Sequence, residues 1–374
     1  MKNQIYLEGI TMKTRTELCA KKQEAIETYG KIGKVTYCEP YGNGHINDTF
    51  LTVTENGKRY IFQRINHLIF TKPHEIMENI CSITEYIRKK VAVAGGDVER
   101  CTLAVVKTDK GESLYKDSIG SYWRLYEFTK GTVTKERVGN KKEFLDCAEA
   151  FGRFHCQLAD FDASLLHEAI PDFHNTPIRY ENLMKAIEKD PCGRVALVEN
   201  EIKFVTDRAE FVHTLEIAHR EGRLPLRVTH NDTKLNNILF DAVTNAPVCI
   251  IDLDTVMPGY SVNDFGDSIR FGANTAEEDE TDLSKVSLDL ELYRAYAEGF
   301  LRGCDEKLTE AEIDLLPIGA RMMTLECGIR FLTDYIEGDI YFRIARENHN
   351  LDRARCQFAL LADMEAKAEK MKLR

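Results

Sequence analysis

The sequence lacks several features that would place it in a specialised class of protein. It has no run of about 18 apolar residues that could span a bilayer, although 43% of its 374 residues are hydrophobic. Its first residues lack the basic-then-apolar order of a secretory signal, so we expect a cytoplasmic protein. The eleven cysteines include no CxxC pair, which argues against a disulfide framework or a structural zinc site. We therefore expect a globular protein with reduced thiols and no membrane partner.

The sequence also lacks an excess of positive charge. Its 50 basic residues are outnumbered by 61 acidic ones, and the net charge of −11 argues against a surface that neutralises nucleic-acid phosphates. We expect a small-molecule substrate, no nucleic-acid partner and a monomer. Single hydrophobic cores stop growing at about 250 to 300 residues. A chain of 374 residues is therefore long enough for two lobes.

The two halves of the chain differ in periodicity. Short segments rich in β-branched and aromatic residues predict strands at 34–41, 49–54, 59–65, 102–108 and 121–128. Isoleucines at helical spacing predict one helix between them, at 73–89. After residue 131 helical patterns dominate, and we expect helices at 144–161, 283–303 and 311–335. The exception is 224–254, where strand-like segments return around loops, the usual position of functional residues.

The loop at the centre of this exception has a chemical signature. His230, Asp232 and Asn237 follow the spacing H-x-D-x-x-x-x-N of a kinase catalytic loop. In phosphoryl transfer such an aspartate orients the acceptor hydroxyl and takes its proton, while the asparagine binds magnesium. Lys234 could reach the transferring phosphate. A polar loop with an Asx-turn is the alternative explanation for these few letters.

The residues after this loop make the kinase interpretation more specific. Residues 238–240 lead through a turn into the apolar segment 247–251, which ends at Asp252-Leu253-Asp254. A buried strand that presents a carboxylate at its tip is how a second magnesium ligand would be supplied. We therefore assign the metal to Asn237 and Asp252, with Asp254 as a further candidate ligand.

Several stretches resemble a known family. HNDTKLNNILFD and VCIIDLD are similar to the aminoglycoside phosphotransferase and choline kinase superfamily of small-molecule kinases. FHNTPIR (173–179), DLDTVMPGYSVNDFGDSIR (252–270) and RFLTDYIEGDIYFR (330–343) resemble the bacterial N-acetylhexosamine 1-kinases. The resemblance implies an α+β, protein-kinase-like fold of two lobes, with ATP and Mg²⁺ as cofactors. We expect a nucleotide-binding lobe at 1–128, with a small antiparallel sheet and one main helix, and a larger, mostly helical catalytic lobe at 129–374.

A second candidate for the metal ligand is the Asp264-Phe265-Gly266 triplet, which matches the DFG of protein kinases. Asp252 follows Asn237 by fifteen residues, enough for one hairpin, whereas Asp264 follows it by twenty-seven. The segment before Asp264 is rich in turn residues and lacks an apolar strand. We therefore keep Asp252 as the ligand, expect Asp264 to be a loop or helix-capping residue, and expect a helix to begin near Asp267.

In the first lobe, the segment 41–49 reads G-x-G-x-x-N between two predicted strands, where a kinase has its phosphate-binding glycine loop. A hairpin turn is the alternative explanation. On the following strand Arg64 takes the place of the kinase lysine, with Glu78 chosen over Glu75 and Glu85 as its acidic partner. The hinge that reads adenine is expected at 127–128. The predicted nucleotide-binding residues are Gly42, Gly44, Asn47, Thr49, Arg64, Glu78, Glu127, Phe128 and Lys234.

The acceptor pocket is assigned through the resemblance to the hexosamine kinases. It implies that Arg330 and Tyr341 reach the sugar, that His45 approaches it from the glycine loop, and that Asp232 faces its anomeric hydroxyl. His174 and Arg179 are further candidates. For each of these side chains, a structural hydrogen bond is the alternative role.

The expected function is ATP-dependent phosphorylation of the anomeric hydroxyl of an N-acetylhexosamine, GlcNAc or GalNAc. Another small-molecule kinase of the superfamily, for choline, an aminoglycoside or another sugar, is the alternative. A protein kinase is disfavoured because Asn231 and Arg64 replace the arginine and lysine of its signatures, and no A-P-E follows. A catalytically silent binding module is disfavoured because Asp232, Asn237 and Asp252 are all present.

Overall fold

The chain divides into two compact units. The computed structural model describes residues 21–42, 46–135 and 139–374. The first unit comprises the described residues up to 132 together with 166–170 and 251–256, and the second comprises 133–165, 171–250 and 257–374. The first change of unit falls close to the boundary expected at residue 128. The sequence did not indicate that two later segments return to the first unit.

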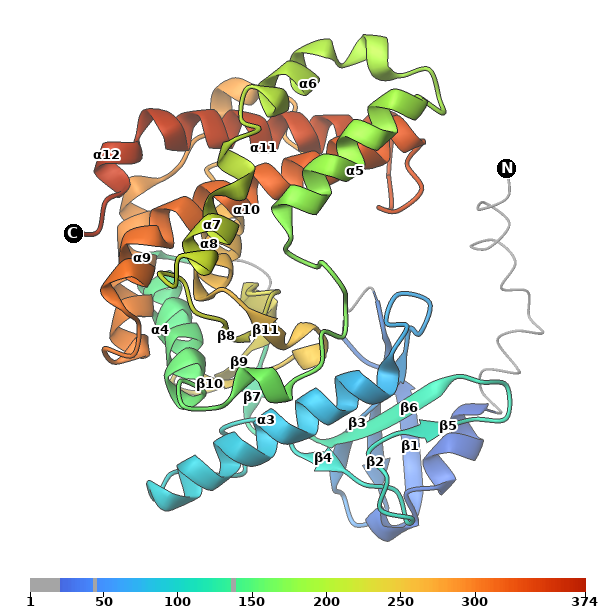
Figure 1. Cartoon of the computed structure of the whole chain (residues 1–374). Helices are drawn as coiled ribbons and strands as arrows, with labels where there is room; N and C mark the ends of the chain where they lie inside the picture. The colour runs from blue at the N-terminus through green and yellow to red at the C-terminus, as the bar shows by residue number, and fades with distance from the viewer. Residues whose placement is uncertain (1–20, 43–45, 136–138) are drawn as a thin grey trace. The chain divides into compact units, whose positions relative to one another are not determined.

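The first unit is built on an antiparallel sheet, whose strands Figure 1 draws in blue to teal. The strand order is β1-β2-β3-β6-β4, with β5 paired to β6. The strands are β1 (Val35–Pro40), β2 (Asp48–Thr54), β3 (Arg59–Ile65), β4 (Val105–Val106), β5 (Tyr115–Lys116) and β6 (Tyr122–Glu127). Alternating residues of β2 and β3 are buried, and the ring of Phe62 stacks on that of Trp123 at 4.9 Å. The expected segment 102–108 contributes only the two residues of β4.

The main helix of this unit is α3 (Pro73–Val93). Proline is favoured in a first helical turn because its missing N–H has no partner there. The isoleucines at 76, 80, 83 and 87 are buried, as their spacing predicted. The helix extends four residues beyond the predicted end at 89.

The second unit is mostly helical, and its helices run from green to red in Figure 1. They are α4 (Lys141–Gln157), α5 (Thr176–Lys189), α6 (Glu199–Thr206), α7 (Thr214–Arg220), α8 (Ser261–Gly272), α9 (Leu290–Cys304), α10 (Glu310–Glu337), α11 (His349–Ala366) and α12 (Ala368–Met371). The predicted helix at 283–303 begins later, because Asp289 caps α9 by accepting the N–H groups of Glu291 and Leu292. The two units together confirm the expected α+β fold class.

Helices α8 and α10 cross in close contact. A Cβ on Gly266 would lie 2.4 Å from the carbonyl oxygen of Gly319, and a Cβ on Gly319 would lie 2.2 Å from that of Val262. Only glycine permits such an approach of two backbones. Phe265 beside this crossing is fully buried, with its ring 5.5 Å from that of Phe300. Two of the three residues of the Asp264-Phe265-Gly266 triplet are therefore packing residues of the core.

A two-stranded sheet and a three-stranded sheet, whose third strand is β7 (Thr132–Val133) beside β9, interrupt the helices of this unit. Strand β8 (Arg227–Thr229) pairs with β11 (Met257–Gly259), and β9 (Ile238–Asp241) pairs with β10 (Pro247–Ile250). The loop with the H-x-D-x-x-x-x-N spacing connects β8 to β9 and includes the short 3₁₀ helix η5 (Leu235–Asn237). Strand β7 lies at the change of unit.

Across the part of the chain that the structure describes, no helix is long and apolar enough to cross a membrane.

Candidate functional site

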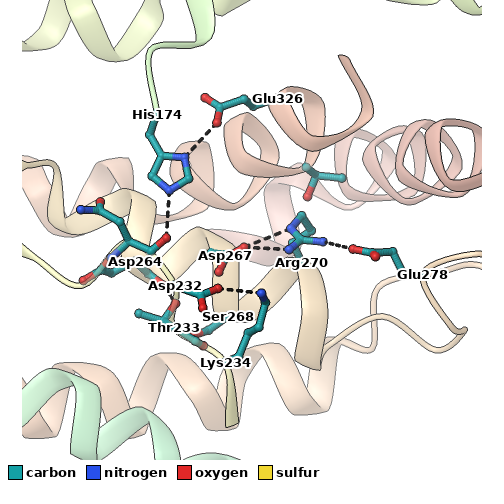
Figure 2. Close-up of polar contacts among 12 residues, drawn as sticks. His174, Asp232, Thr233, Lys234, Asp264, Asp267, Ser268, Arg270, Glu278 and Glu326 are labelled. Carbon is teal, nitrogen blue, oxygen red and sulfur yellow. Dashed lines mark hydrogen bonds and ion pairs between the residues drawn. The ribbon is translucent and has the colours of Figure 1, made fainter. Parts of the chain in front are cut away.

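The loop between β8 and β9 gathers three of the predicted site residues around one carboxylate. The side-chain amide of Asn237 donates to both the backbone oxygen and Oδ2 of Asp232, at 2.8 and 2.9 Å. Lys234 Nζ lies 2.7 Å from Oδ1 of Asp232, as Figure 2 shows. Because the nitrogen of the Asn237 amide is turned to Asp232, its oxygen is the atom left for a cation. The Asp232 side chain keeps 28% of its exposure, so a substrate can approach it.

Lys234 is held in its charged form. Burial alone would lower the pKa of its ammonium group, but the carboxylates of Asp232 and Asp267 outweigh burial and raise that pKa to about 12. The loop therefore presents a permanent cation beside the candidate base. Such a pair suits a reaction in which negative charge moves between oxygen atoms.

Asp264 anchors the backbone of this loop. Its two carboxylate oxygens accept the backbone N–H groups of His230 and Asn231, both at 2.7 Å, and His155 Nε2 lies 3.0 Å from Oδ2. Burial would raise the pKa of Asp264, but the hydrogen bond from His155 and the neighbouring donors lower it below its usual range. The prediction of a loop or capping residue was wrong. Helix α8 begins at Ser261, six residues before the expected start, and Asp264 lies in its first turn.

Further hydrogen bonds from α8 continue this anchoring along the loop. Thr233 Oγ1 donates to the backbone oxygen of Asp264 at 2.7 Å, and Ser268 Oγ donates to that of Thr233 at 2.7 Å. Ser268 in turn accepts from the hydroxyl of Tyr296 at 2.6 Å. Figure 2 shows Thr233 and Ser268 close together below Asp264. Since α8 is packed against α10 through Gly266, the loop rests on a rigid support.

His174, one of the candidates for the acceptor pocket, is engaged by the protein at both ring nitrogens. Nδ1 lies 2.8 Å from Glu326 Oε1, and Nε2 lies 3.2 Å from the backbone oxygen of Asn231. The other oxygen of Glu326 accepts from Thr176 Oγ1 at 2.7 Å. The structure thus differs from the expected sugar contact, because His174 bridges α10 and the loop between β8 and β9.

Three other acceptor candidates lie close together at the end of α10. The guanidinium of Arg330 lies over the rings of Phe173, Tyr341 and Phe342, at 5.8, 6.0 and 5.4 Å. Arg179 donates to the backbone oxygen of Phe173 at 2.9 Å. Burial and the positive charge of Arg330 lower the pKa of Arg179. The group combines two cations with aromatic faces, and Tyr341 is largely exposed.

The loop that carries Tyr341 depends on a residue that the sequence reasoning missed. Asp334 accepts the backbone N–H groups of Ile340, Tyr341 and Phe342, at 2.9, 2.7 and 2.9 Å. It also accepts from the side chain of Asn350 at 2.9 Å. Asp334 lies one helical turn after Arg330, so one helix positions both acceptor candidates. An acidic residue one turn before a helix-ending glycine, here Gly338, is the signal that could have indicated this role.

In the first unit, Arg64 has a different partner from the one expected. Its Nε donates to Asp48 Oδ2 at 2.6 Å, and the two residues are opposite each other on β3 and β2. Glu78 instead lies 2.7 Å from Nε2 of His167. Directly opposed residues on adjacent antiparallel strands bring side chains close, whereas helix α3 offers its glutamate elsewhere. The expected pairing of Arg64 with Glu78 was therefore wrong.

Asp254, a candidate metal ligand, is occupied by protein groups. Both of its oxygens are bound by the guanidinium of Arg124, with Nη2 at 2.9 Å from Oδ2, and Asn47 Nδ2 donates to the same oxygen at 2.6 Å. Arg124 and Asp254 are both about 2% exposed. The structure differs from the expectation, because a buried bidentate ion pair leaves Asp254 no oxygen turned to solvent. The carboxylate of Asp252, two residues earlier, remains as the metal candidate of this segment.

The backbone of Asp252 has an uncommon conformation. Its φ of 58° lies in the left-handed region, which is sparsely populated by residues other than glycine and is concentrated at functional sites. The ion pair of Arg124 with Asp254 fixes the chain two residues after Asp252. This arrangement fixes the direction in which the chain leaves Asp252.

The glycine segment and the predicted hinge meet in the first unit. The ring of Tyr41 lies 6.1 Å from that of Phe128, and the guanidinium of Arg59 covers the same ring at 4.1 Å. Gly42 has a φ of 79°, a conformation that glycine adopts without strain. The backbone N–H of Glu127 donates to Ala104 at 2.9 Å. Thr49 Oγ1 accepts from the side chain of Gln63, while Gly44 and His45 lie outside the described residues.

The donor chemistry of the site fits a magnesium ion. Within the described ranges no group of three or more His, Cys, Asp or Glu side chains could hold a metal. Magnesium does not need one, because it is commonly bound through one or two carboxylates together with substrate phosphates and water. The carboxylate of Asp252, in the first unit, and the amide oxygen of Asn237, in the second, are each a ligand type of this kind.

Comparison with known proteins places the chain among phosphotransferases. The model of the phosphotransferase enzyme family (APH) matches residues 38–299. An aminoglycoside phosphotransferase from Alicyclobacillus acidocaldarius has a similar structure, with a TM-score of 0.62 and 13% identity over 92% of this chain and 95% of that chain. A microcompartment-associated aminopropanol kinase gives 0.61 and 16% identity over 94% and 98%. An amicoumacin kinase in complex with AMP-PNP and Ca²⁺ gives 0.54 and 15% over 92% and 95%. At these identities the solved structures show a shared fold.

Proposed function

The chain belongs to the phosphotransferase enzyme family (APH), and from this premise we propose that it transfers the γ-phosphoryl group of ATP to the anomeric hydroxyl of an N-acetylhexosamine, GlcNAc or GalNAc. The observation that carries the proposal is the arrangement of Asp232, Asn237 and Lys234 on the loop between β8 and β9. A partly exposed carboxylate beside a cation and an amide oxygen suits phosphoryl transfer to a hydroxyl.

Each residue has a separate role in this reaction. Asp232 accepts the proton of the acceptor hydroxyl as that oxygen attacks phosphorus. Lys234 offsets the negative charge on the transferring group. Asn237 and Asp252 hold Mg²⁺, which when bound neutralises charge on the phosphates. The complex of the amicoumacin kinase with AMP-PNP and Ca²⁺ agrees with a nucleotide and a divalent cation in this fold.

The nucleotide is assigned to residues of the first unit. Gly42 and its neighbours approach the phosphates, Arg64 provides a cation, and the ring of Phe128 lies at the hinge that reads adenine. The contact between Tyr41 and Phe128 supports this assignment, because it brings the glycine segment and the hinge to one place. Asp48, which pairs with Arg64, would hold the guanidinium in position for the phosphates.

The acceptor is assigned to the group at the end of α10. Arg179 and Arg330 are both cations, so this pocket disfavours choline or an aminoglycoside, which carry positive charge and attract carboxylates. Aromatic faces at Phe173 and Tyr341 suit the apolar faces of a sugar ring, and guanidinium donors suit its hydroxyl and acetamido oxygens. The hexosamine proposal rests on this chemistry and on the resemblance of the segments 173–179 and 330–343.

The test is an assay of ADP release with ATP and Mg²⁺ across a panel of GlcNAc, GalNAc, glucose, galactose, choline, ethanolamine and an aminoglycoside. We expect turnover with the N-acetylhexosamines and a sugar 1-phosphate product, identified by phosphorus NMR. Turnover with choline or an aminoglycoside alone would refute the sugar assignment while leaving the phosphotransferase chemistry intact.

The matched pair of variants for this assay is Asp232→Asn and Asp207→Asn. Asp207 is an exposed aspartate of the same unit, paired only with the surface Lys203 at 2.8 Å among the contacts described. We expect Asp232→Asn to lower kcat by about 100-fold or more, since a positioned general base contributes about 10²–10⁴. Asp207→Asn should keep wild-type turnover. Near-normal turnover of Asp232→Asn would overturn the assignment of the base.

A further inference from the structure

The backbone of Asn231, the residue before the candidate base Asp232, is held on both sides. On one side Asp264 accepts the N–H groups of His230 and Asn231, both at 2.7 Å. On the other side His174 Nε2 lies 3.2 Å from the carbonyl oxygen of Asn231. Figure 2 shows the His174 ring between the loop and Glu326.

Asn231 itself has a φ of 64°, in the left-handed region that residues other than glycine rarely adopt. Such a conformation persists only when the surrounding structure fixes it. If the hold from either side were lost, Asn231 could relax to an ordinary conformation. The carboxylate of the next residue, Asp232, would then turn away from its place between Asn237 and Lys234.

The two contacts of His174 determine which protons its ring carries. A carbonyl oxygen can only accept, so Nε2 must bear the proton that faces Asn231. Glu326 Oε1, 2.8 Å from Nδ1, is also an acceptor when ionised, and Oε2 of the same carboxylate already accepts from Thr176. Only the imidazolium form donates from both nitrogens. The geometry therefore favours a charged His174.

The charges around His174 come from three helices and the loop. Glu326 on α10 and Asp267 on α8 carry negative charge. Burial would lower the pKa of His174, but these two carboxylates and the Asn231 carbonyl outweigh burial and raise it.

Two arginines also act on Glu326. Arg330, on α10, and Arg179, on α5, both interact with the Glu326 carboxylate. Burial would raise the pKa of Glu326, but His174, Arg330 and the hydroxyl of Thr176 lower it. On the loop, Asp232 and Lys234 neutralise each other through their ion pair. The carboxylate beside His174 is therefore ionised over the physiological range of pH.

We propose that His174 is a positioning residue for Asp232. As an imidazolium, His174 links the Asn231 carbonyl to Glu326 through two hydrogen bonds, and it releases the carbonyl when the ring loses a proton. The effect on turnover rests on the proposed function. The hold on the loop backbone does not, so the two can fail separately. Nothing in this role requires His174 to touch a substrate, although the sequence had suggested that it does.

Hydrogen exchange of the backbone amides measures how firmly the loop is held, and it needs no phosphoryl-acceptor substrate. His174→Ala should speed the exchange of backbone amides in residues 229–235 by about tenfold or more, while amides in the middle of α10 exchange as in the wild type. His213→Gln is the matched control, because His213 is an exposed histidine of the same unit. Unchanged exchange at 229–235 in His174→Ala would overturn the proposal, whatever the substrate of the enzyme.

Turnover tests the consequence for Asp232. We expect His174→Ala to lower kcat by about 10- to 100-fold with little change in the KM for ATP, because a small misplacement of a catalytic group can cost about 100-fold. His174→Gln, which can still donate one hydrogen bond to the Asn231 carbonyl, should recover part of that loss. A loss of kcat no larger than the loss of folded protein, measured by circular dichroism, would overturn the positioning role.

The dependence of kcat on pH shows whether the charge of His174, rather than only its packing, holds the loop. When neutral, the His174 ring has one proton, which Glu326 attracts to Nδ1, so Nε2 can no longer donate to Asn231. Wild-type kcat should therefore fall as pH rises through the raised pKa of His174. In Glu326→Gln the amide can donate to Nδ1 and let neutral His174 keep its proton on Nε2, so this alkaline fall should disappear.

The pH arm also remains informative if His174→Ala does not fold, because Glu326→Gln is nearly isosteric and keeps an acceptor for Thr176. Parallel pH profiles of the wild type and Glu326→Gln would overturn the proposal. If the wild type turns over no acceptor at all, the proposed function has failed. In that case the exchange of residues 229–235 still decides whether His174 holds the loop.

Discussion

Replacing Asp264 with alanine should destabilise the second unit and abolish turnover together. The substitution removes the acceptor of three buried donors: the N–H groups of His230 and Asn231 and the Nε2 group of His155. A buried donor left without a partner costs about 1–3 kcal/mol. Three such donors give about 3–9 kcal/mol, and relaxation of the loop brings the expected loss to about 3–5 kcal/mol.

Two spectroscopic probes make this loss measurable. The chain has one tryptophan, Trp123, which lies in the core of the first unit, whereas most helices belong to the second. Urea unfolding followed by far-ultraviolet circular dichroism therefore reports mainly on the unit that contains Asp264. With a slope of about 3 kcal/mol per molar urea, a loss of 3–5 kcal/mol moves the midpoint down by about 1–1.7 M.

Asp252→Ala is the control variant that distinguishes a metal ligand from a residue that anchors the loop. A metal ligand at the edge of a substrate site contributes to turnover more than to stability, so Asp252→Ala should lose activity at a nearly unchanged urea midpoint. If Asp264→Ala instead unfolded like the wild type and its lost turnover were restored by raised Mg²⁺, Asp264 would be the metal ligand. The anchoring role described above would then be wrong.

Three further outcomes follow from buried contacts. Gly266→Ala would place a methyl group against the backbone of α10, so it should lower the free energy of unfolding by about 3 kcal/mol or more in the same urea assay. An unchanged midpoint would contradict the close crossing of the two helices. Arg124→Met leaves the Asp254 carboxylate buried without its cation, so the free energy of unfolding followed by tryptophan fluorescence should fall by about 3–5 kcal/mol. A fall of less than about 1 kcal/mol would show that the fold does not depend on this ion pair. The pair of Glu326 with His174 stabilises the fold fully between pH 4.5 and pH 6.5, the ordinary pKa values of Glu and His. Its contribution is lost as pH falls through the lowered pKa of Glu326, and also as pH rises through the raised pKa of His174. The difference in midpoint between wild type and Glu326→Gln should therefore be largest between those values and shrink at alkaline pH, and a difference that grew with pH would contradict this.

Local patterns in the sequence were enough to predict the elements that carry the site. The spacing of the four isoleucines predicted α3, and segments rich in β-branched and aromatic residues predicted β2 and β3 with bounds that differ by at most one residue. The loop spacing placed Asp232 and Asn237 in one loop between two strands, where their side chains are hydrogen-bonded. In each case the information lay within a few residues of sequence.

The contacts that the sequence did not predict join distant segments. Arg124 and Asp254 are 130 residues apart in sequence, and His174 and Glu326 are 152 apart. No local period encodes such a pair, and each side chain alone is also compatible with a place on the surface. Asp264 shows the same limit, because its neighbours fit the DFG pattern while its partners are the amides of a loop more than 30 residues earlier.

The return of residues 251–256 to the first unit has a topological consequence. The chain changes unit after residues 132, 165, 170, 250 and 256, so no single cut separates the two halves. A fragment that begins at residue 133 would retain Asp254 but lose Arg124 and Asn47, which would leave a carboxylate without its partners. Any attempt to express the helical part alone, or to exchange it with that of a relative, should therefore carry a compensating change at Asp254.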